Sequence, residues 1–460
     1  MSTSVSETDL QSQLVLTPHP LQRLGAHAIA ALAGAAHPEQ VTGGQFDVVV
    51  ARMISDLAAT STVAKGDPGW YLLGVSYLVW PNCALHYASK RTVEGITAWR
   101  SMPPPDRWPG VPCMLCGRAA VAWYGKGDIP LGASVEHRNT TAPGHQGTPL
   151  CWPCVSSFHA LPYACAAGGG VLAGLHSWDE RFMARAARTA MVHNRQAMLT
   201  RGDLKRGGGA FAVEFTALQA LRWWDKRLTD GVQTVQFSNN NQDQRFQVED
   251  LDQPLAEWLR STVRDQERRA GFRYLAAAQA TAKVRGLRML AWRAFHQPHQ
   301  IPTRGVQWLR DHSADGAIPA AAPLLAPLIR SYLTEVLHVL DKDVGHVTTV
   351  AGRIAEVITE SGHLKRFVVA TRQPRDLKSW LKKEATDWTR TRSGEGPFID
   401  TVQWRVLFDM GNTSWSARDL LYIAVLEQLC ARGWNPKPDD DTVLDDLDFA
   451  TLDIEDATEN

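Results

Sequence analysis

The 460-residue sequence lacks a long apolar run: no stretch approaches the ~18 apolar residues that a membrane-spanning helix needs. The N-terminus, MSTSVSETDLQSQ, also lacks the basic and then apolar pattern that is typical of a signal peptide. From these absences we expect a cytoplasmic protein with no membrane partner. The chain is 44% hydrophobic and 21% charged, and it is long enough for about two to four domains.

Cysteine is scarce and its count is odd. Seven cysteines in 460 residues exclude the dense disulfide framework of small secreted domains. The chain also lacks the G-x4-G-K-S/T phosphate-binding motif, so nucleotide hydrolysis is not indicated, and it has no internal repeat. What remains to be interpreted is the placement of four cysteines and the distribution of charge.

Four of the cysteines form two pairs, Cys113 with Cys116 and Cys151 with Cys154, separated by 34 residues. A C-x-x-C pair can be a redox dithiol, but the second pair follows a turn-rich loop and not the strand of a thioredoxin-like unit. Two pairs together supply the tetrahedral thiolate shell that Zn²⁺ prefers. We therefore predict a structural zinc site within residues 111–166, in which four thiolates leave no open position for a catalytic water.

An enzymatic alternative lies in the same region. HNH nucleases place an acidic–His pair, an Asn and a later His around a catalytic metal on a cysteine-knuckle scaffold. Here Glu136, His137 and Asn139 lie between the two pairs, and His159 follows the second. The match is loose, because Glu stands where Asp is usual and the segment after the second pair is small and apolar. The HNH-type nuclease stays open as the alternative, and surface loop residues are the simpler explanation.

The formal net charge of zero conceals a strong asymmetry. Residues 438–460 hold ten acids and no base, so we predict a disordered acidic tail over 437–460. Without those acids the remaining chain carries 48 − 38 = +10. Residues 260–310 hold eleven Lys and Arg against two acids, which gives +9.

Arg260, Arg264 and Arg268 recur every four residues, which predicts that they lie on one face of one helix. This basic segment predicts contacts with nucleic-acid phosphates, because scattered surface charge would mix signs. A solvated face or a protein interface is the other interpretation. A second basic element, LKRGGGAF, combines two cations with glycines that allow close approach of the backbone to a phosphate. The residues that we predict to bind nucleic acid here are Arg260, Arg264, Arg268, Arg285, Arg288, Lys205 and Arg206.

Two β-rich runs, TVQF and RFQVEDL, flank the Asn-rich loop SNNNQDQ and predict a β-hairpin. Asn offers both a donor and an acceptor to a base edge, so Asn239, Asn240 and Asn241 at the tip are candidate base readers. Asn-rich tips are equally explained by turn chemistry alone.

The predicted fold class is α+β. A mixed N-terminal region, residues 1–315, holds the zinc-binding insert and the hairpin, and a C-terminal α-helical bundle follows over 318–436. Helices are expected at 21–34 and 44–58, and WYLLGVSYLVWPN is expected to form a strand because it is rich in β-formers. The bundle carries its own apolar stripes, so we expect it to fold alone.

Several motifs together resemble a known family. They are HPLQRLGAHAIAAL near the N-terminus, V-W-P-N at 79–82, C-x2-C-G, P-L-C-x-x-C followed by A-L-P, and a terminal helix with W-x-x-R-D-L-L. The chain resembles the large subunit of type I CRISPR effector complexes (Cascade), in particular the zinc-containing, Cst-type subunits of type I-B systems. The resemblance spans most of residues 15–435, and this chain departs from the family in its short length and its acidic tail.

The resemblance implies a non-catalytic protein of antiviral defence, not an enzyme. Family members contact the guide RNA (crRNA) 5′ handle, recognise the target-adjacent motif on double-stranded DNA and help R-loop formation. Their partners are the other Cascade subunits, including the 5′-handle-capping and backbone subunits, and a helicase-nuclease or a transposition factor. The implied domains are a flanking-motif-recognition domain over 1–315 and a small-subunit-like bundle over 318–436.

Overall fold

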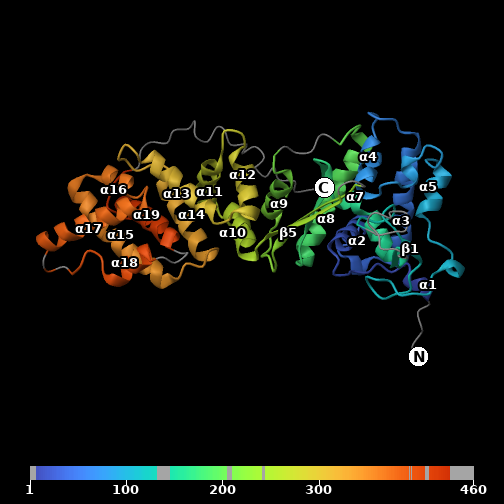
Figure 1. The fold of residues 1–460 in the computed structure, drawn as a ribbon, viewed down its shortest axis with the longest axis horizontal. Coiled ribbons are helices and arrows are strands. Elements are labelled where there is room, and N and C mark those ends of the chain that lie inside the picture. The colour runs from blue at the N-terminus through green and yellow to red at the C-terminus, as the bar shows by residue number, and fades with distance from the viewer. Residues whose placement is uncertain are drawn as a thin grey trace, which may run out of the picture. The chain divides into compact units, whose positions relative to one another are not determined.

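The computed structural model describes residues 7–131, 146–204, 210–240, 244–392, 394, 396–409 and 414–435 (Figure 1). The chain forms two compact units. Unit 1 comprises residues 1–220 and 226–253, and unit 2 comprises residues 221–225 and 254–460. The predicted boundary at 315–318 differs from this division, because the helices between 254 and 312 belong to the C-terminal unit and not to the N-terminal one. The predicted acidic tail lies outside the described residues.

Unit 1 is a mixed α+β unit, as predicted. Its helices are α1 (Glu7–Leu10), α2 (Pro20–Leu32), α3 (Gly43–Ala58), α4 (Trp70–Val79), α5 (Val93–Arg100), α6 (Trp152–His159), α7 (Leu161–Ala164), α8 (Glu180–Thr200) and most of α9 (Ala212–Trp223). A small antiparallel sheet pairs β1 (Ala122–Tyr124) with β2 (Thr148–Leu150). A second antiparallel sheet has the order β3 (Ala166–Gly168), β4 (Val171–His176), β5 (Val232–Asn239) and β6 (Gln244–Leu251).

The two predicted N-terminal helices are present as α2 and α3. α3 begins at a capping box in which the Thr42 side chain accepts from the Gln45 backbone N–H. The predicted β-hairpin is also present, because β5 and β6 pair in register from Val232 with Leu251 to Asn239 with Gln244.

The predicted strand at residues 70–82 is wrong, because WYLLGVSYLV forms helix α4. Most of its residues are buried, so the run is apolar on nearly every side and shows no alternation. A continuous apolar run of this kind does not distinguish a buried strand from a buried helix. Here helical packing determined the outcome.

α2 is the central helix of unit 1 and packs on α6, α7 and α8. Gly25 allows the closest approach: a Cβ added at this position would lie 1.7 Å from the backbone oxygen of Ser157 on α6. The backbones of these two helices are therefore in direct contact, and a larger residue cannot fit between them.

Unit 2 is entirely helical over its described residues. Its helices are α10 (Gln253–Arg264), α11 (Gln266–Gln279), α12 (Gly286–His296), α13 (Gln300–His312), α14 (Ala322–Glu335), α15 (Asp341–Ser361), α16 (Leu364–Ala370), α17 (Pro374–Thr391), α18 (Thr401–Phe408) and α19 (Ser414–Ala431). α19 is buried along most of its length and packs on α13, α14, α15 and α18. α11 packs on α12, α13 and α14, which joins the first helices of the unit to the last.

Buried polar contacts reinforce this joint. Arg310 on α13 forms an ion pair with Asp419 on α19, with an N–O distance of 2.9 Å and both side chains nearly inaccessible. The Trp258 indole on α10 donates to the Ser331 hydroxyl on α14 at 2.9 Å, and its ring packs edge-on against Tyr332.

Among the described residues, no helix combines the length and the apolar character needed to cross a membrane.

Candidate metal centre and charged surfaces

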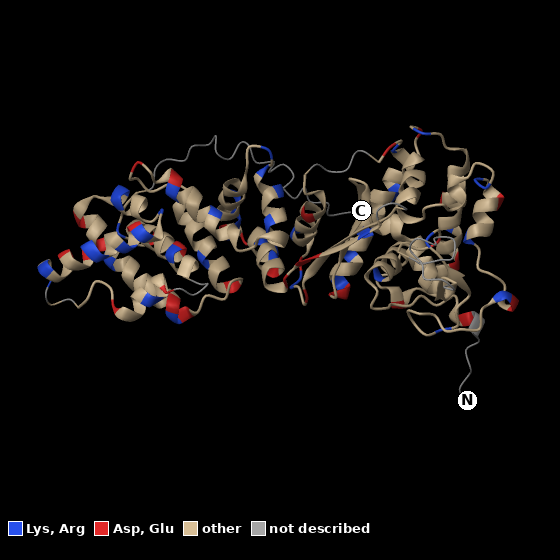
Figure 2. Cartoon of the chain, viewed as in Figure 1, with Lys and Arg blue, Asp and Glu red and all other residues tan. Residues whose placement is uncertain are grey.

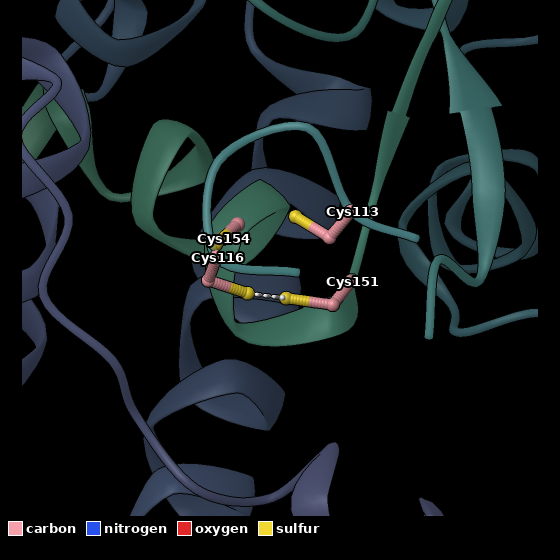
Figure 3. A group of neighbouring side chains, drawn as sticks. All are labelled: Cys113, Cys116, Cys151 and Cys154. Carbon is pink, nitrogen blue, oxygen red and sulfur yellow. Dashed lines mark hydrogen bonds between the residues drawn. The ribbon is translucent and has the colours of Figure 1, made fainter. Parts of the chain in front are cut away.

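The four predicted cysteines come together in unit 1. The Sγ atoms of Cys113, Cys116, Cys151 and Cys154 all lie within 4.8 Å of one another (Figure 3). Cys116 Sγ and Cys151 Sγ are 3.4 Å apart, far beyond the ~2.05 Å of a disulfide, and all four are free thiols. Tetrahedral metal–sulfur bonds of ~2.3 Å place ligand sulfurs about 3.8 Å apart, so the cluster has the dimensions of a four-thiolate metal site.

The first pair lies on a tight hairpin. Pro112 and Ala119 form an antiparallel bridge, and Cys113 N–H donates to the Arg118 carbonyl at 2.6 Å. Gly117 has a φ of +77°, the left-handed region that glycine enters without strain. This turn brings Cys116 back beside Cys113.

The second pair is positioned by β2 and α6. β2 pairs with β1 and ends at Leu150, so Cys151 follows directly and becomes the residue before the first turn of α6. Cys154 lies in that first turn, behind Pro153, which suits the start of a helix. β2 therefore positions the Sγ atom of Cys151, and the first turn of α6 positions that of Cys154.

Gln11 connects the two pairs, and Arg118 joins the first pair to the N-terminal segment; neither is among the predicted site residues. The Gln11 amide donates to the Ala119 carbonyl at 3.1 Å, and its oxygen accepts from the Trp152 N–H at 2.8 Å. Arg118 donates to the carbonyls of Leu10 and Gln13 at 3.0 and 2.6 Å. The N-terminal segment thus fixes both cysteine turns, although an isolated glutamine near a polar terminus gives no sequence signal for this role.

The thiols of the cluster affect one another's ionisation. Hydrogen bonds from Cys116, Cys151 and Cys154 lower the pKa of Cys113, so this sulfur is the first to become a thiolate. The pKa of Cys154 is raised, first by its hydrogen bond with Cys113, because a second thiolate beside the first is unfavourable. A bound divalent cation would remove that penalty for all four sulfurs.

Of the alternative nuclease residues, only His159 lies in the described part of the chain; Glu136, His137 and Asn139 lie outside it. His159 is 7% exposed, and its ring packs edge-on against Trp80 and Trp152 at centroid distances of 6.3 and 6.2 Å. Burial lowers its pKa well below the ordinary value. The side chain is enclosed by aromatic rings and does not open onto a surface.

Asn239, a predicted base reader, is a buried structural residue with 0% exposure. Its amide nitrogen donates to the carbonyls of Val79, Lys126 and Ile129 at 2.8, 2.9 and 3.2 Å. Its oxygen accepts from the Leu131 N–H and from the Gln244 side chain. Asn239 therefore cannot present its amide to a base, whereas Asn240 is exposed and Asn241 lies outside the described residues.

The arginines predicted to form one basic helix face are divided between two helices. α10 ends at Arg264, and Asp265 caps the start of α11, so Arg268 belongs to the second helix. Arg260 is paired with Glu257 at 2.6 Å, and Arg268 is paired with Glu335 at 2.7 Å. Arg264 donates to the Trp224 carbonyl at 2.7 Å. Each guanidinium is therefore already held by an acceptor of the protein.

The other predicted basic residues are partly accessible or lie outside the described ranges. Arg285 precedes α12 and is exposed, and Arg288 lies in its first turn, partly exposed. Lys205 and Arg206 lie outside the described residues.

Seven further cations, none of them among the predicted nucleic-acid-binding residues, lie on α16, on α17 and in the turn between them (Figure 2), and we call this group the α16–α17 face. None of its seven cations forms an ion pair or a side-chain hydrogen bond with another residue in the described part of the chain. Lys378 lies 5.9 and 5.3 Å from the ring centroids of Trp404 and Phe408, and Lys382 lies 5.9 Å from that of Trp404. The seven are Lys365, Arg366, Arg372, Arg375, Lys378, Lys382 and Lys383.

Comparison with known proteins gives no relative: no protein-family model, curated protein or solved structure matches the chain.

Proposed function

We propose that the protein is the zinc-stabilised, non-catalytic large subunit of an RNA-guided type I CRISPR surveillance complex in the cytoplasm. In this role it recognises the target-adjacent motif on double-stranded DNA, contacts the guide RNA 5′ end and helps R-loop formation. Base pairing reads most of the target in such complexes, so the protein needs only a few base-edge contacts and many phosphate contacts.

The observation that carries the proposal is that the four resemblance motifs of unit 1 meet around the cysteine cluster; the fifth, W-x-x-R-D-L-L, lies in α19 of unit 2. Gly25, in the HPLQRLGAHAIAAL motif, lies against Ser157 of the helix that carries Cys154. Trp80, in the V-W-P-N motif, lies against His159, directly before the A-L-P segment. Motifs far apart in the sequence therefore share one core, which supports a common structural origin for the resemblance.

Zinc is the metal that we propose for the cluster. Four thiolates form a soft, closed donor set that suits Zn²⁺ and leaves no position for a metal-bound water. The site then contributes folding free energy and no chemistry.

The protein is proposed to have no nuclease activity of its own. Burial of His159 between tryptophan rings supports this part of the proposal, because a catalytic metal ligand or general base has to reach the substrate. The HNH-type alternative predicts metal-dependent DNA cleavage by the purified chain that His137→Ala abolishes. Under the proposal, no cleavage is detected with either protein.

In unit 2 the α16–α17 face is the surface that we propose for phosphate contacts. Its cations form no ion pair within the described ranges, although the charges of Lys383 and Arg366 act on Glu384 of α17, whereas Arg260 and Arg268 already hold carboxylates. Neighbouring aromatic rings are typical of single-strand binding surfaces, where bases stack beside a basic groove. Arg285 and Arg288 remain candidates for contacts with phosphates of the same nucleic acid.

Co-purification tests the proposal. The chain is expressed with its genomic neighbours, purified by a tag on the chain, and the bound nucleic acid is sized. The expected result is RNA of one uniform length, together with the backbone and 5′-handle-capping subunits. A chain that purifies without defined RNA and without these subunits would contradict the assignment, and a zinc-stabilised nucleic-acid-binding protein of another context would then replace it.

A further inference from the structure

A second buried polar cluster of unit 1 surrounds Arg100, the last residue of α5. Arg100 is 1% exposed. Its Nε, Nη1 and Nη2 atoms are all buried and have no hydrogen-bond partner within the described ranges. A buried guanidinium with five unused N–H donors is unfavourable and needs a compensating group.

Two tryptophans compensate only part of this cost. The guanidinium carbon of Arg100 lies 4.1 Å from the Trp80 ring centroid and 3.6 Å from the Trp99 ring centroid. These cation–π contacts stabilise the charge on the faces of the planar group. They leave the N–H donors unsatisfied, because those donors point outward in the plane of the guanidinium.

The same region contains three more buried polar atoms without partners among the described residues: Trp80 Nε1, Tyr124 Oη and His159 Nε2. Trp80 and His159 are in ring contact, and the charge of Arg100 acts on both His159 and Tyr124. The indole N–H is only a donor, and the phenol O–H supplies another. The cluster therefore has an excess of donors around one positive charge.

The nearby acidic groups do not satisfy these donors. Asp128 acts electrostatically on Arg100, but its Oδ1 accepts from Trp99 Nε1 at 2.9 Å and its Oδ2 accepts from the Gly125 N–H at 3.2 Å. Cys83 is also close, but burial raises its pKa to about 11, so it is a neutral thiol at pH 7. Burial lowers the pKa of Arg100 to about 9, which leaves the guanidinium charged at pH 7.

We propose that this cluster binds a small inorganic anion of halide size, held by the edge of Arg100 with Trp80 Nε1 and Tyr124 Oη as further donors. One anion would neutralise the buried charge and accept several of the unused N–H and O–H groups at once. Because Arg100 and Trp80 are 1% and 0% exposed, the ligand is one that unit 1 encloses, and chloride is the natural probe. The proposal is independent of the CRISPR assignment and of the metal site.

The site would have a structural effect on the neighbouring elements. Trp80 follows α4, Arg100 ends α5, Tyr124 ends β1 and His159 ends α6, so one anion would contact or brace four segments. Binding that occurs only in the folded state raises stability with ligand concentration.

Thermal unfolding of the full chain tests this effect. Chloride is exchanged for gluconate at constant ionic strength, and bromide is used as a substitute halide. Once the chloride concentration exceeds the Kd, the Tm of the unit 1 transition should rise by about 3–5 °C for each tenfold rise in chloride concentration. Bromide should act like chloride. The same dependence should remain in Arg107→Gln, which changes an exposed arginine outside the cluster.

Two variants locate the effect. Trp80→Phe keeps an aromatic ring at this position but removes the indole donor, and should raise the apparent chloride Kd about tenfold or more. Arg100→Met should abolish the halide dependence, and if it fails to fold, the wild-type and Trp80→Phe data still decide the question. Equal Tm values in chloride and gluconate would overturn the proposal.

Crystals grown in sodium bromide supply a direct readout. An anomalous bromide peak in contact with the Arg100 guanidinium would support the site. Water density with no anomalous peak at that position would show that ordered solvent, and not an anion, satisfies these donors, and the proposal would fail.

Discussion

Gly25 shows how a single residue determines the position of the metal site. α2 and α6 touch through their backbones at this point, and α6 carries Cys154 in its first turn. We predict that Gly25→Ala destabilises the protein by about 3 kcal/mol or more, because the new Cβ meets a backbone oxygen that cannot move aside alone.

Gly44→Ala is the matched control, because Gly44 lies in α3 and has open space where a Cβ would be. Alanine there should be neutral or stabilising by up to about 1 kcal/mol. Urea unfolding of both variants checks the difference. Equal stabilities of Gly25→Ala and Gly44→Ala would show that the α2–α6 approach is looser than described.

The cysteines themselves give the second prediction at this scale. Purified protein should contain about one zinc ion per chain. Cys151→Ser should lose the metal and the cooperative unfolding of unit 1, since metal binding here is folding free energy. Cys430→Ser, which changes a partly exposed cysteine of unit 2, should keep both properties. Metal analysis and calorimetry check this, and a stable, metal-free wild-type protein would contradict it.

At the residue scale, the sequence predicted some roles and missed others for physical reasons. The four cysteines were predictable because metal chemistry requires two pairs of thiolates at short spacing. Gln11 was not, since its role is two hydrogen bonds to residues more than a hundred positions away. Asn239 was assigned to turn chemistry or base reading, but its amide joins a strand end to the segments around Val79 and Lys126.

Among the helices, the charge on α17 gives the sharpest prediction. Replacing Lys378, Lys382 and Lys383 with Ala should weaken nucleic-acid binding about equally for all sequences. It should flatten the slope of log K against log salt by about 2–3, since each lost phosphate contact removes ~0.7–0.9. Arg268→Ala is the comparison, and it should change the slope much less because the Arg268 guanidinium already forms an ion pair with Glu335.

The salt dependence of binding, measured by fluorescence anisotropy with labelled single strands, separates these surfaces. If Arg268→Ala changes the salt slope more than the triple lysine variant does, the phosphate contacts lie on α10 and α11. Unchanged nucleic-acid binding in both variants would mean that both surfaces contact other proteins and not nucleic acid.

At the element scale, the two errors have different causes. α4 was predicted as a strand because its side chains are β-formers, but burial on nearly every side made both structures compatible with the sequence. The Arg260–Arg268 periodicity predicted one helix, but Asp265 caps a new one. The β5–β6 hairpin was predictable because alternating residues and a turn-forming loop agree.

For the whole molecule, the position of the unit boundary changes what is expected of fragments. A bundle of residues 319–435 would lose the partners of α14 and α19, including Trp258, Arg310 and Ser313. It would also leave Asp419 buried without its arginine, which is strongly destabilising. We predict that 254–435 unfolds cooperatively in urea and that 319–435 does not. Circular dichroism of both fragments checks this, and cooperative unfolding of 319–435 would support the boundary predicted at 315–318.

The two units should also differ in their response to acid. Burial is the largest cause that lowers the pKa of five unit 1 histidines: His19, His27, His86, His159 and His176. The unfolded chain binds protons at these positions near pH 6.5, and the folded chain does so only at lower pH, about 4 for His86. Their contribution to stability is therefore complete above pH 6.5 and is lost as the pH falls toward 4.

The described histidines of unit 2 are all partly or fully exposed, so its stability should depend less on pH in this range. We predict that the Tm of unit 1 falls between pH 7 and pH 5, while that of the 254–435 fragment changes little. Calorimetry of the full chain with excess zinc, beside the fragment, checks this. A fragment that loses as much stability as unit 1 would contradict it.

The path of the chain between the units has a consequence for synthesis on the ribosome. Residues 221–225 belong to unit 2, but the β5–β6 hairpin that follows them completes the sheet of unit 1. Leu221 and Trp224, both buried in the finished protein, emerge before the rest of unit 2, from residue 254 on, has been synthesised. At a synthesis rate of ~5–20 residues per second, these apolar side chains stay exposed for several seconds while the β5–β6 hairpin forms. Chaperones that bind nascent apolar segments should therefore engage this chain just after residue 224 leaves the exit tunnel.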